Sequence, residues 1–164
     1  PMDSAAGQHV FSSEAAFDIL HPASIQLDGI GGSNFVTSIG KTHLLITDDS
    51  GQHYLGLAHN TLYSPNTGVN ILSVCQCQCG PAQVDVSSNT TPAATFDGVR
   101  FPLLLRDGLF VLPFHLVSMN DPLFWSLPRV NISPPPHRIH QCHRPGGHAK
   151  TLHPHPKHFV RPSL

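Results

Sequence analysis

The sequence predicts an all-β domain, and three observations support that prediction. Short β-favouring runs recur at intervals of ~8–12 residues and are separated by turn residues. The chain holds 16 prolines and 13 glycines among 164 residues, which favours many turns and little helix. No long segment repeats its apolar residues with the period of an α-helix. Such closely spaced strands are typical of a sandwich or a small barrel.

The first part of the chain predicts a loop, a helical turn and a hairpin. Asp3 lies in a loop of small residues, and residues 12–17 begin with two serines, either of which can cap one helical turn. Residues 24–27 alternate polar and apolar side chains, and residues 34–37 favour β-structure. Glycines between these runs predict a pliant hairpin tip, because glycine adopts positive φ without steric cost. The tip consists of Gly29, Ile30, Gly31 and Gly32.

Further strands follow in the middle of the chain. We predict them at residues 43–47, 53–57, 69–74, 96–105 and 109–112. Asp-Asp-Ser-Gly separates the first two of these runs, and Arg-Asp-Gly separates the last two. Both of these short sequences are strong turn signals. Each of these two pairs is therefore predicted to form a hairpin.

Charge and composition divide the chain into two segments. Residues 1–128 hold all ten acidic residues and three basic ones, whereas residues 129–164 hold six basic residues and no acidic one. The second segment also contains seven of the thirteen histidines. It has few large apolar residues, so it cannot bury enough surface to offset the entropy of ordering. We therefore expect a folded domain over residues 1–125 and a disordered, low-complexity basic tail over residues 126–164.

The cysteines and the apolar runs bear on cofactors and location. No apolar run reaches the ~20 residues that a bilayer span requires, so we expect no membrane partner. Cys75, Cys77 and Cys79 are crowded together, which is not the pattern of a secreted disulfide framework. These cysteines could hold a metal, but no second pair exists to complete a zinc site, and reduced thiols are the favoured interpretation. We expect no metal, no cofactor and an intracellular, cytoplasmic location.

Asp3 is the candidate catalytic residue. A carboxylate held by main-chain amides in a tight loop can activate water, but it needs a partner that shares its proton. Two close carboxylates that share one proton divide into an acid and a base. The chain contains one Asp-Ser-Ala triplet, so the second carboxylate must come from a second copy of the protein. The alternative is that Asp3 only accepts amide hydrogen bonds in a turn.

Three motifs follow one another in an order that is itself informative. Asp3-Ser4-Ala5-Ala6 is followed closely by His9, residues 62–65 read Leu-Tyr-Ser-Pro, and residues 70–74 read Asn-Ile-Leu-Ser-Val. This order resembles the aspartic protease segment of Copia-type long-terminal-repeat retrotransposon polyproteins, and more distantly the retroviral proteases. That family typically reads Asp-Ser-Gly-Ala with a nearby His, then Leu-Tyr-x-Pro, then Asn-Leu-Leu-Ser-Val. The resemblance covers residues 2–115, and it depends on the ordered set because no single motif is specific.

The resemblance implies a fold and a set of roles. It implies a small retropepsin-like barrel, one lobe per chain, that acts as a homodimer on a polypeptide such as a Gag-Pol-like polyprotein. The catalytic loop would contain Asp3, Ser4 and Ala5, with the Ser4 hydroxyl bracing the two loops of the dimer. Gly29, Ile30, Gly31 and Gly32 would lie in the flap that closes over the substrate. Asn70, Ile71 and Leu72 would form the strand that stiffens the active-site loop.

The chain departs from that family at two places, and several interpretations stay open. The family has glycine where Ala5 stands, and a hydrophobic strand where only Pro1 and Met2 precede Asp3. An ordinary glycine loop is the alternative to the flap, and a turn or cap role is the alternative for Ser4. Three functions follow: an aspartic endopeptidase, a catalytically inactive retroelement relic that only dimerises, or a module that contacts nucleic acid weakly through its basic tail.

Overall fold

The computed structural model describes residues 1–3, 6–29, 32–80, 82–87 and 90–135. Within these ranges most of the regular structure is β-strand, so the all-β prediction is confirmed. The strands are β1 Met2–Asp3, β2 Val10–Phe11, β3 Phe17–Gly29, β4 Gly32–Thr47, β5 His53–Tyr63, β6 Leu72–Ser73, β7 Gln83–Asp85, β8 Ala93–Phe96, β9 Val99–Pro102, β10 Leu104–Arg106, β11 Leu109–Val111, β12 His115–Leu116 and β13 Arg129–Asn131. The helices are α1 Val74–Gln78 and α2 Leu123–Ser126, with 3-10 turns at Glu14–Ala16 and Pro65–Thr67.

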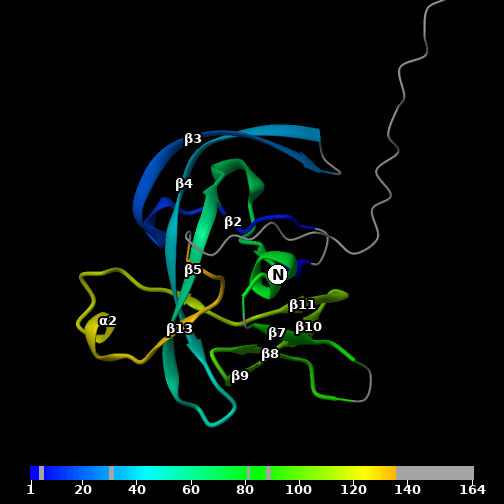
Figure 1. Cartoon of the computed structure of the whole chain (residues 1–164), viewed down its shortest axis with the longest axis vertical. Coiled ribbons are helices and arrows are strands. Elements are labelled where there is room, and N and C mark those ends of the chain that lie inside the picture. The colour runs from blue at the N-terminus through cyan, green and yellow to red at the C-terminus, as the bar shows by residue number, and fades with distance from the viewer. Residues whose placement is uncertain (4–5, 30–31, 81, 88–89, 136–164) are drawn as a thin grey trace, which may run out of the picture.

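The largest sheet curls into a half barrel (Figure 1). Its strands run in the order β12-β4-β5-β13, with β3 paired to β4 and β2 paired to β5. β3 and β4 form a long antiparallel hairpin in which Gly29 pairs with Gly32. The hairpin therefore closes where the glycine cluster predicts it, although Ile30 and Gly31 lie outside the described residues.

The curvature of this sheet has a local cause at Lys41. Each strand beside β4 places two residues opposite this one: Asp18 and Ile19 on β3, and His59 and Asn60 on β5. An extra residue in one strand is a β-bulge, which bends the strand and increases its twist. Asn60 has a φ of 51°, which is uncommon for a residue other than glycine. The bulges in β3 and β5 lie opposite the same residue of β4, and this double bulge bends the sheet on both sides of that strand.

Gly40 is required for this bend. A Cβ at Gly40 would lie 2.4 Å from the carbonyl oxygen of Ile19, which is closer than any real Cβ contact. Only glycine therefore allows β3 to approach β4 at the bulge.

Three apolar clusters hold the sheet against the rest of the chain, and two of them bear on the candidate site. The larger one joins the sheet to the three-stranded antiparallel sheet β7-β8-β9, and Tyr54 packs edge-on against Phe101 with ring centroids 5.5 Å apart. The smaller one lies under the β3–β4 hairpin. There Val36 packs with Val10 and Leu62, and Ile71 lies against them. The hairpin thus rests on the segments that follow Asp3.

The predicted strand at residues 69–74 is shorter than expected. β6 ends at Ser73, and the chain then forms α1. Ser73 is the N-cap, and its hydroxyl accepts a hydrogen bond from the Gln76 backbone N–H at 3.0 Å, which explains the switch from strand to helix. The cysteines therefore belong to a helical turn. Cys77 is a buried thiol, but Cys79 is disulfide-bonded, so the expectation of reduced thiols is wrong for Cys79.

The predicted strand at residues 96–105 covers parts of three strands: the end of β8, all of β9 and most of β10. The chain turns at Asp97 and Gly98, which have φ values of 48° and 84°, and β8 and β9 form a hairpin there. A two-residue turn with positive φ at both positions matches the right-handed twist of its strands. Asp-Gly was the signal for this turn, and the long apolar run after it concealed the break.

The folded part extends beyond the predicted boundary at residue 125. β13 pairs in parallel with β5, and Val130 and Ile132 are buried. A Cβ added to Gly56 would lie 2.7 Å from Ile132 Cδ1, so Ile132 occupies the space that this glycine leaves open. The apolar alternation here is too short, and too close to prolines, to predict a strand from sequence. In the described part of the chain, no helix combines the length and apolar character that crossing a bilayer requires.

Replacing Ile132 should therefore destabilise the whole domain. We expect Ile132→Ala to lower the free energy of unfolding by about 2–5 kcal/mol, because it removes a fully buried side chain. Ile19→Ala is the matched control, since that side chain is 63% exposed and its loss should cost less than about 0.5 kcal/mol. Urea unfolding measures both. Equal effects would show that residues 129–133 do not belong to the core.

Candidate functional site

The site is built around Asp3, at the end of β1. β1 pairs in parallel with β6, so that Asp3 is the register partner of Ser73. The Leu72 backbone N–H donates to the Pro1 carbonyl oxygen at 2.9 Å, and the Met2 side chain is buried in the core. Asp3 itself is half-buried. The strand pair thus fixes the backbone at the carboxylate while part of the side chain faces solvent. Ser4 and Ala5, the other predicted members of the catalytic loop, lie outside the described residues.

The structure brings Asn70, Ile71 and Leu72 to the same place. Ile71 exchanges two backbone hydrogen bonds with Val10, at 2.7 and 2.9 Å. Asn70 Oδ1 accepts from the Ser12 N–H at 3.0 Å and from the Ser12 hydroxyl at 3.2 Å. Leu72 is buried beside β1. Asn70 and Ile71 thus hold the segment that leaves the Asp3 loop, and Leu72 packs against the strand that enters it.

Ser73 ties both ends of the loop together. Its hydroxyl donates to the Ala6 carbonyl oxygen at 2.6 Å, and its backbone N–H donates to His9 Nδ1 at 2.9 Å. Ser73 is fully buried, so water does not compete for these contacts. Ser73 therefore contacts both Ala6 and His9, which lie three residues apart in the segment that follows Asp3.

His9 is held as a neutral imidazole. Its Nδ1 accepts from Ser73, so Nε2 carries the ring proton in the neutral form. Nε2 has no hydrogen-bond partner among the described residues. The ring is fully buried, and burial lowers the pKa of His9 to about 3, with a smaller contribution from His59. A charged ring here would be buried without a counter-ion, which is unfavourable.

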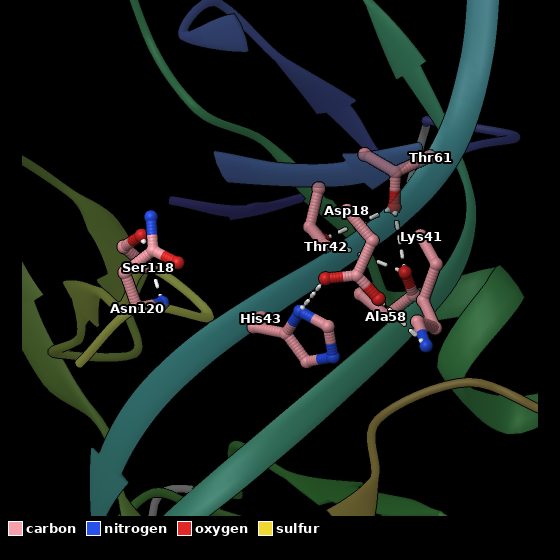
Figure 2. A network of polar contacts seen from close by, with 8 residues as sticks. All are labelled: Asp18, Lys41, Thr42, His43, Ala58, Thr61, Ser118 and Asn120. Atoms are coloured by element: carbon pink, nitrogen blue, oxygen red, sulfur yellow. Dashed lines mark hydrogen bonds and ion pairs between the residues drawn. The ribbon is translucent and has the colours of Figure 1, made fainter. Parts of the chain in front are cut away.

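A second polar cluster lies at the double bulge, and Figure 2 shows it. Asp18 contacts Lys41 Nζ at 2.7 Å through Oδ2 and His43 Nδ1 at 2.5 Å through Oδ1. Burial lowers the pKa of His43 to about 4, and the Asp18 carboxylate opposes that shift. The Asp18 carboxylate is thus already paired with two groups, and we exclude it as the proton-sharing partner of Asp3.

The bulge also has its own hydrogen bonds. The Thr61 hydroxyl donates to the Ala58 carbonyl oxygen at 3.1 Å, and it lies 3.4 Å from the Thr42 hydroxyl (Figure 2). These buried contacts satisfy polar groups where the regular ladder between β4 and β5 is interrupted. The bulge is therefore a fixed part of the sheet.

The remaining predicted site residues lie in the hairpin. Gly29 and Gly32 pair at its closed end, and Ile30 and Gly31 between them are outside the described residues. The structure therefore places Gly29 and Gly32 at the closed end of a long hairpin, which is where the flap prediction puts them.

Two residues of the candidate site, Ser73 and Gln76, are not predicted from the sequence, although Ser-Val-Cys-Gln has the Ser-x-x-Gln pattern of a capping box. In that motif the glutamine side chain normally returns to the N-cap backbone. Here the Gln76 carboxamide accepts instead from the His9 N–H at 2.7 Å. The pattern could have located the helix start, but not this distant partner.

Comparison with known proteins does not assign the chain. No protein family matches it, and no curated protein is significantly similar to it.

The state of His9 predicts how stability depends on pH. The unfolded chain takes up a proton on this ring near pH 6.5, whereas the folded protein does so only near pH 3. The unfolded state therefore binds more protons between these values, and stability falls as the pH drops through that window, by about 1.4 kcal/mol per pH unit for one proton.

His9→Asn tests this, because the Asn amide oxygen can replace Nδ1 as an acceptor. We expect the variant to be less stable than the wild type at pH 8 and to lose less stability on acidification. The gap between the two should narrow from pH 6.5 to pH 4 in urea unfolding followed by circular dichroism. A gap that stays constant would contradict the assignment of His9 as a buried neutral residue.

Proposed function

We propose that the chain is an aspartic endopeptidase of the Copia retrotransposon type, which acts as a homodimer with Asp3 of each copy in one active site. The observation that carries this proposal is the fixation of the Asp3 backbone. β1 pairs with β6, and Ser73 and His9 tie the following loop back to the same segment. A partly exposed carboxylate on a backbone that is paired in this way supports a role in water activation.

The chemistry needs two carboxylates. One, ionised, takes a proton from a water molecule as the water oxygen attacks the peptide carbonyl carbon. The other, protonated, donates a hydrogen bond to the carbonyl oxygen and so stabilises the developing charge. Transfer of a proton to the amide nitrogen then breaks the carbon–nitrogen bond. Neither carboxylate can perform both roles at once, so a single Asp3 is insufficient.

A two-fold dimer supplies the second carboxylate from the same sequence. An isologous interface places identical residues on either side of its axis, so two Asp3 loops can meet there. The β3–β4 hairpin of each copy is the proposed flap, which would cover the substrate and exclude water. The proposed substrate is a Gag-Pol-like polyprotein, and the proposed location is the cytoplasm.

Asp3→Asn tests the catalytic role. We expect it to lower peptide cleavage by at least about 10²–10⁴-fold, because asparagine can neither accept nor supply the shared proton. The fold and the dimer should persist. Asp107→Asn makes the same chemical change in an exposed turn with a φ of 50°, which asparagine tolerates, and should leave cleavage unchanged. Cleavage of a polyprotein-derived peptide is followed by mass spectrometry.

Mixing wild-type and Asp3→Asn subunits tests the dimer. If both Asp3 residues are needed, an equal mixture at exchange equilibrium retains about a quarter of the wild-type activity, because only wild-type pairs are active. A monomeric enzyme retains about half. If the wild type and an Ala5→Gly variant both dimerise but cleave nothing between pH 4 and pH 7, the inactive relic is the correct account.

A second candidate function is contact with single-stranded nucleic acid. Trp125 is the only tryptophan of the chain, and its side chain is 69% exposed. The Arg129 guanidinium lies 5.9 Å from the centre of its ring. Arginine beside an exposed aromatic ring is a common platform for a nucleic-acid base, and residues 130–164 add five more basic residues and no acidic one.

Tryptophan fluorescence tests this candidate directly, because a single residue gives the signal. We expect an oligo-dT to quench Trp125 and to bind about tenfold or more weaker at 200 mM than at 50 mM salt, since phosphate contacts release counter-ions. Trp125→Leu should weaken binding, measured by anisotropy of a labelled oligonucleotide, whereas Leu123→Ala, also exposed on α2, should not. Binding that is independent of salt would exclude this function.

A further inference from the structure

The side chain of Gln76 joins three segments that are far apart in the sequence. Its carboxamide oxygen accepts from the His9 backbone N–H at 2.7 Å. Its amide nitrogen donates to the carbonyl oxygens of His59 and Asn60, at 2.8 and 3.4 Å. One side chain of α1 therefore contacts both the loop that follows Asp3 and the bulge of β5.

Few side chains could make these contacts. A carboxamide presents an acceptor at one end and a donor at the other. Glutamate at this position would keep the acceptor for His9, but it would place a negative charge against two carbonyl oxygens. Leucine would satisfy neither end. The contacts therefore depend on the chemical identity of Gln76 and not only on its shape.

At its first end, the carboxamide completes the fixation of His9. The ring of this residue is held by the Ser73 N–H at 2.9 Å, and its carbonyl oxygen accepts from the Leu62 N–H at 2.9 Å. The contact with Gln76 also engages the backbone N–H of His9. His9 is thus held through its ring and both of its backbone polar groups, where the chain leaves the Asp3 loop.

At its second end, the carboxamide holds the bulge that bends the hairpin. His59 and Asn60 are the two residues of β5 that face Lys41 of β4. Asn60 has a φ of 51°, a conformation that persists only where its surroundings enforce it. β4 continues from this bulge into the β3–β4 hairpin. Both ends of one side chain therefore add to the pairing of β2 with β5 in setting the hairpin relative to the segment that follows Asp3.

We propose that Gln76 is a positioning residue that couples the Asp3 loop to the β3–β4 hairpin. The coupling runs from His9 through the carboxamide to the His59 and Asn60 carbonyls, and across the bulge to β4. This inference rests on the proposed function, in which Asp3 acts on the substrate and the hairpin covers it. Its effect is on the rate of the chemical step, because a displacement of about 1 Å at a catalytic group can lower the rate about 100-fold.

The experiment compares Gln76→Leu, which removes both ends of the link, with Gln76→Glu, which retains only the acceptor. Gln78→Leu is the matched control, since it lies on the same helix with an exposed side chain. Ile132→Ala is the second control, because it removes core packing and none of the side-chain hydrogen bonds of the site. It shows what a loss of stability alone does to activity.

We expect Gln76→Leu and Gln76→Glu each to lower kcat by about 10–100-fold while KM changes less than about threefold. Gln78→Leu and Ile132→Ala should keep kcat within about twofold at a temperature where all variants are folded. Wild-type kcat in Gln76→Glu would overturn the coupling, because that variant loses only the contact to β5. A loss in Gln76→Leu no larger than that in Ile132→Ala would also overturn it.

Hydrogen exchange separates this inference from the proposed function, because it does not require activity. We expect Gln76→Glu to increase deuterium uptake in residues 6–11 and in residues 56–63 together, relative to Gln78→Leu. An increase confined to residues 56–63 would overturn the coupling. If both segments respond but the wild-type chain cleaves no peptide, the proposed protease activity fails and the structural coupling stands.

Discussion

The curvature of the main sheet depends on the two bulges that face Lys41, and the arrangement of the site follows from that curvature. A flat β4 would carry the hairpin away from the body of the protein. The bend instead lays Val36 against Val10 and Leu62, so that the hairpin rests on the segment leaving the Asp3 loop. The same irregularity turns two carbonyl groups of β5 toward Gln76. Gly40 is the sequence feature on which all of this depends, since any side chain there would push β3 away.

The sequence predicted the parts of the fold that local chemistry decides. The turn at residues 48–51, the glycine hairpin and the alternating strands follow from residues that are adjacent in the chain. β13 could not be predicted, because it is a strand only through its pairing with β5 and the space beside Gly56. The order of motifs predicts a strand beside the Asp3 loop, and in the structure Leu72 pairs with Met2 while Asn70 contacts Ser12. The Gln76 contacts could not be predicted, because the partner residue His9 is 67 positions away.

The buried histidines place a limit on the proposed chemistry. Aspartic catalysis requires a shared proton and therefore favours acidic conditions. His9 and His43 are both buried, with pKa values lowered to about 3 and about 4. The fold therefore becomes less stable as the pH falls, which is the same change that favours the shared proton. His9 also holds the loop that the reaction would use. The protein would thus be most effective where enough Asp3 pairs hold a proton and these imidazoles are still neutral.

The parallel pairing of β1 with β6 has a consequence for the order of assembly. Asp3 and Ser73 are register partners although the intervening chain includes both arms of the hairpin and all of β5. Pairings between such distant segments form late in folding, because the entropy cost of closing a long loop comes before the contacts stabilise the chain. During synthesis the carboxylate emerges well before the helix that steadies it. If Asp3 is catalytic as proposed, a growing chain would lack the contacts that steady this carboxylate until α1 has been made, and it could not yet cut peptides, including itself.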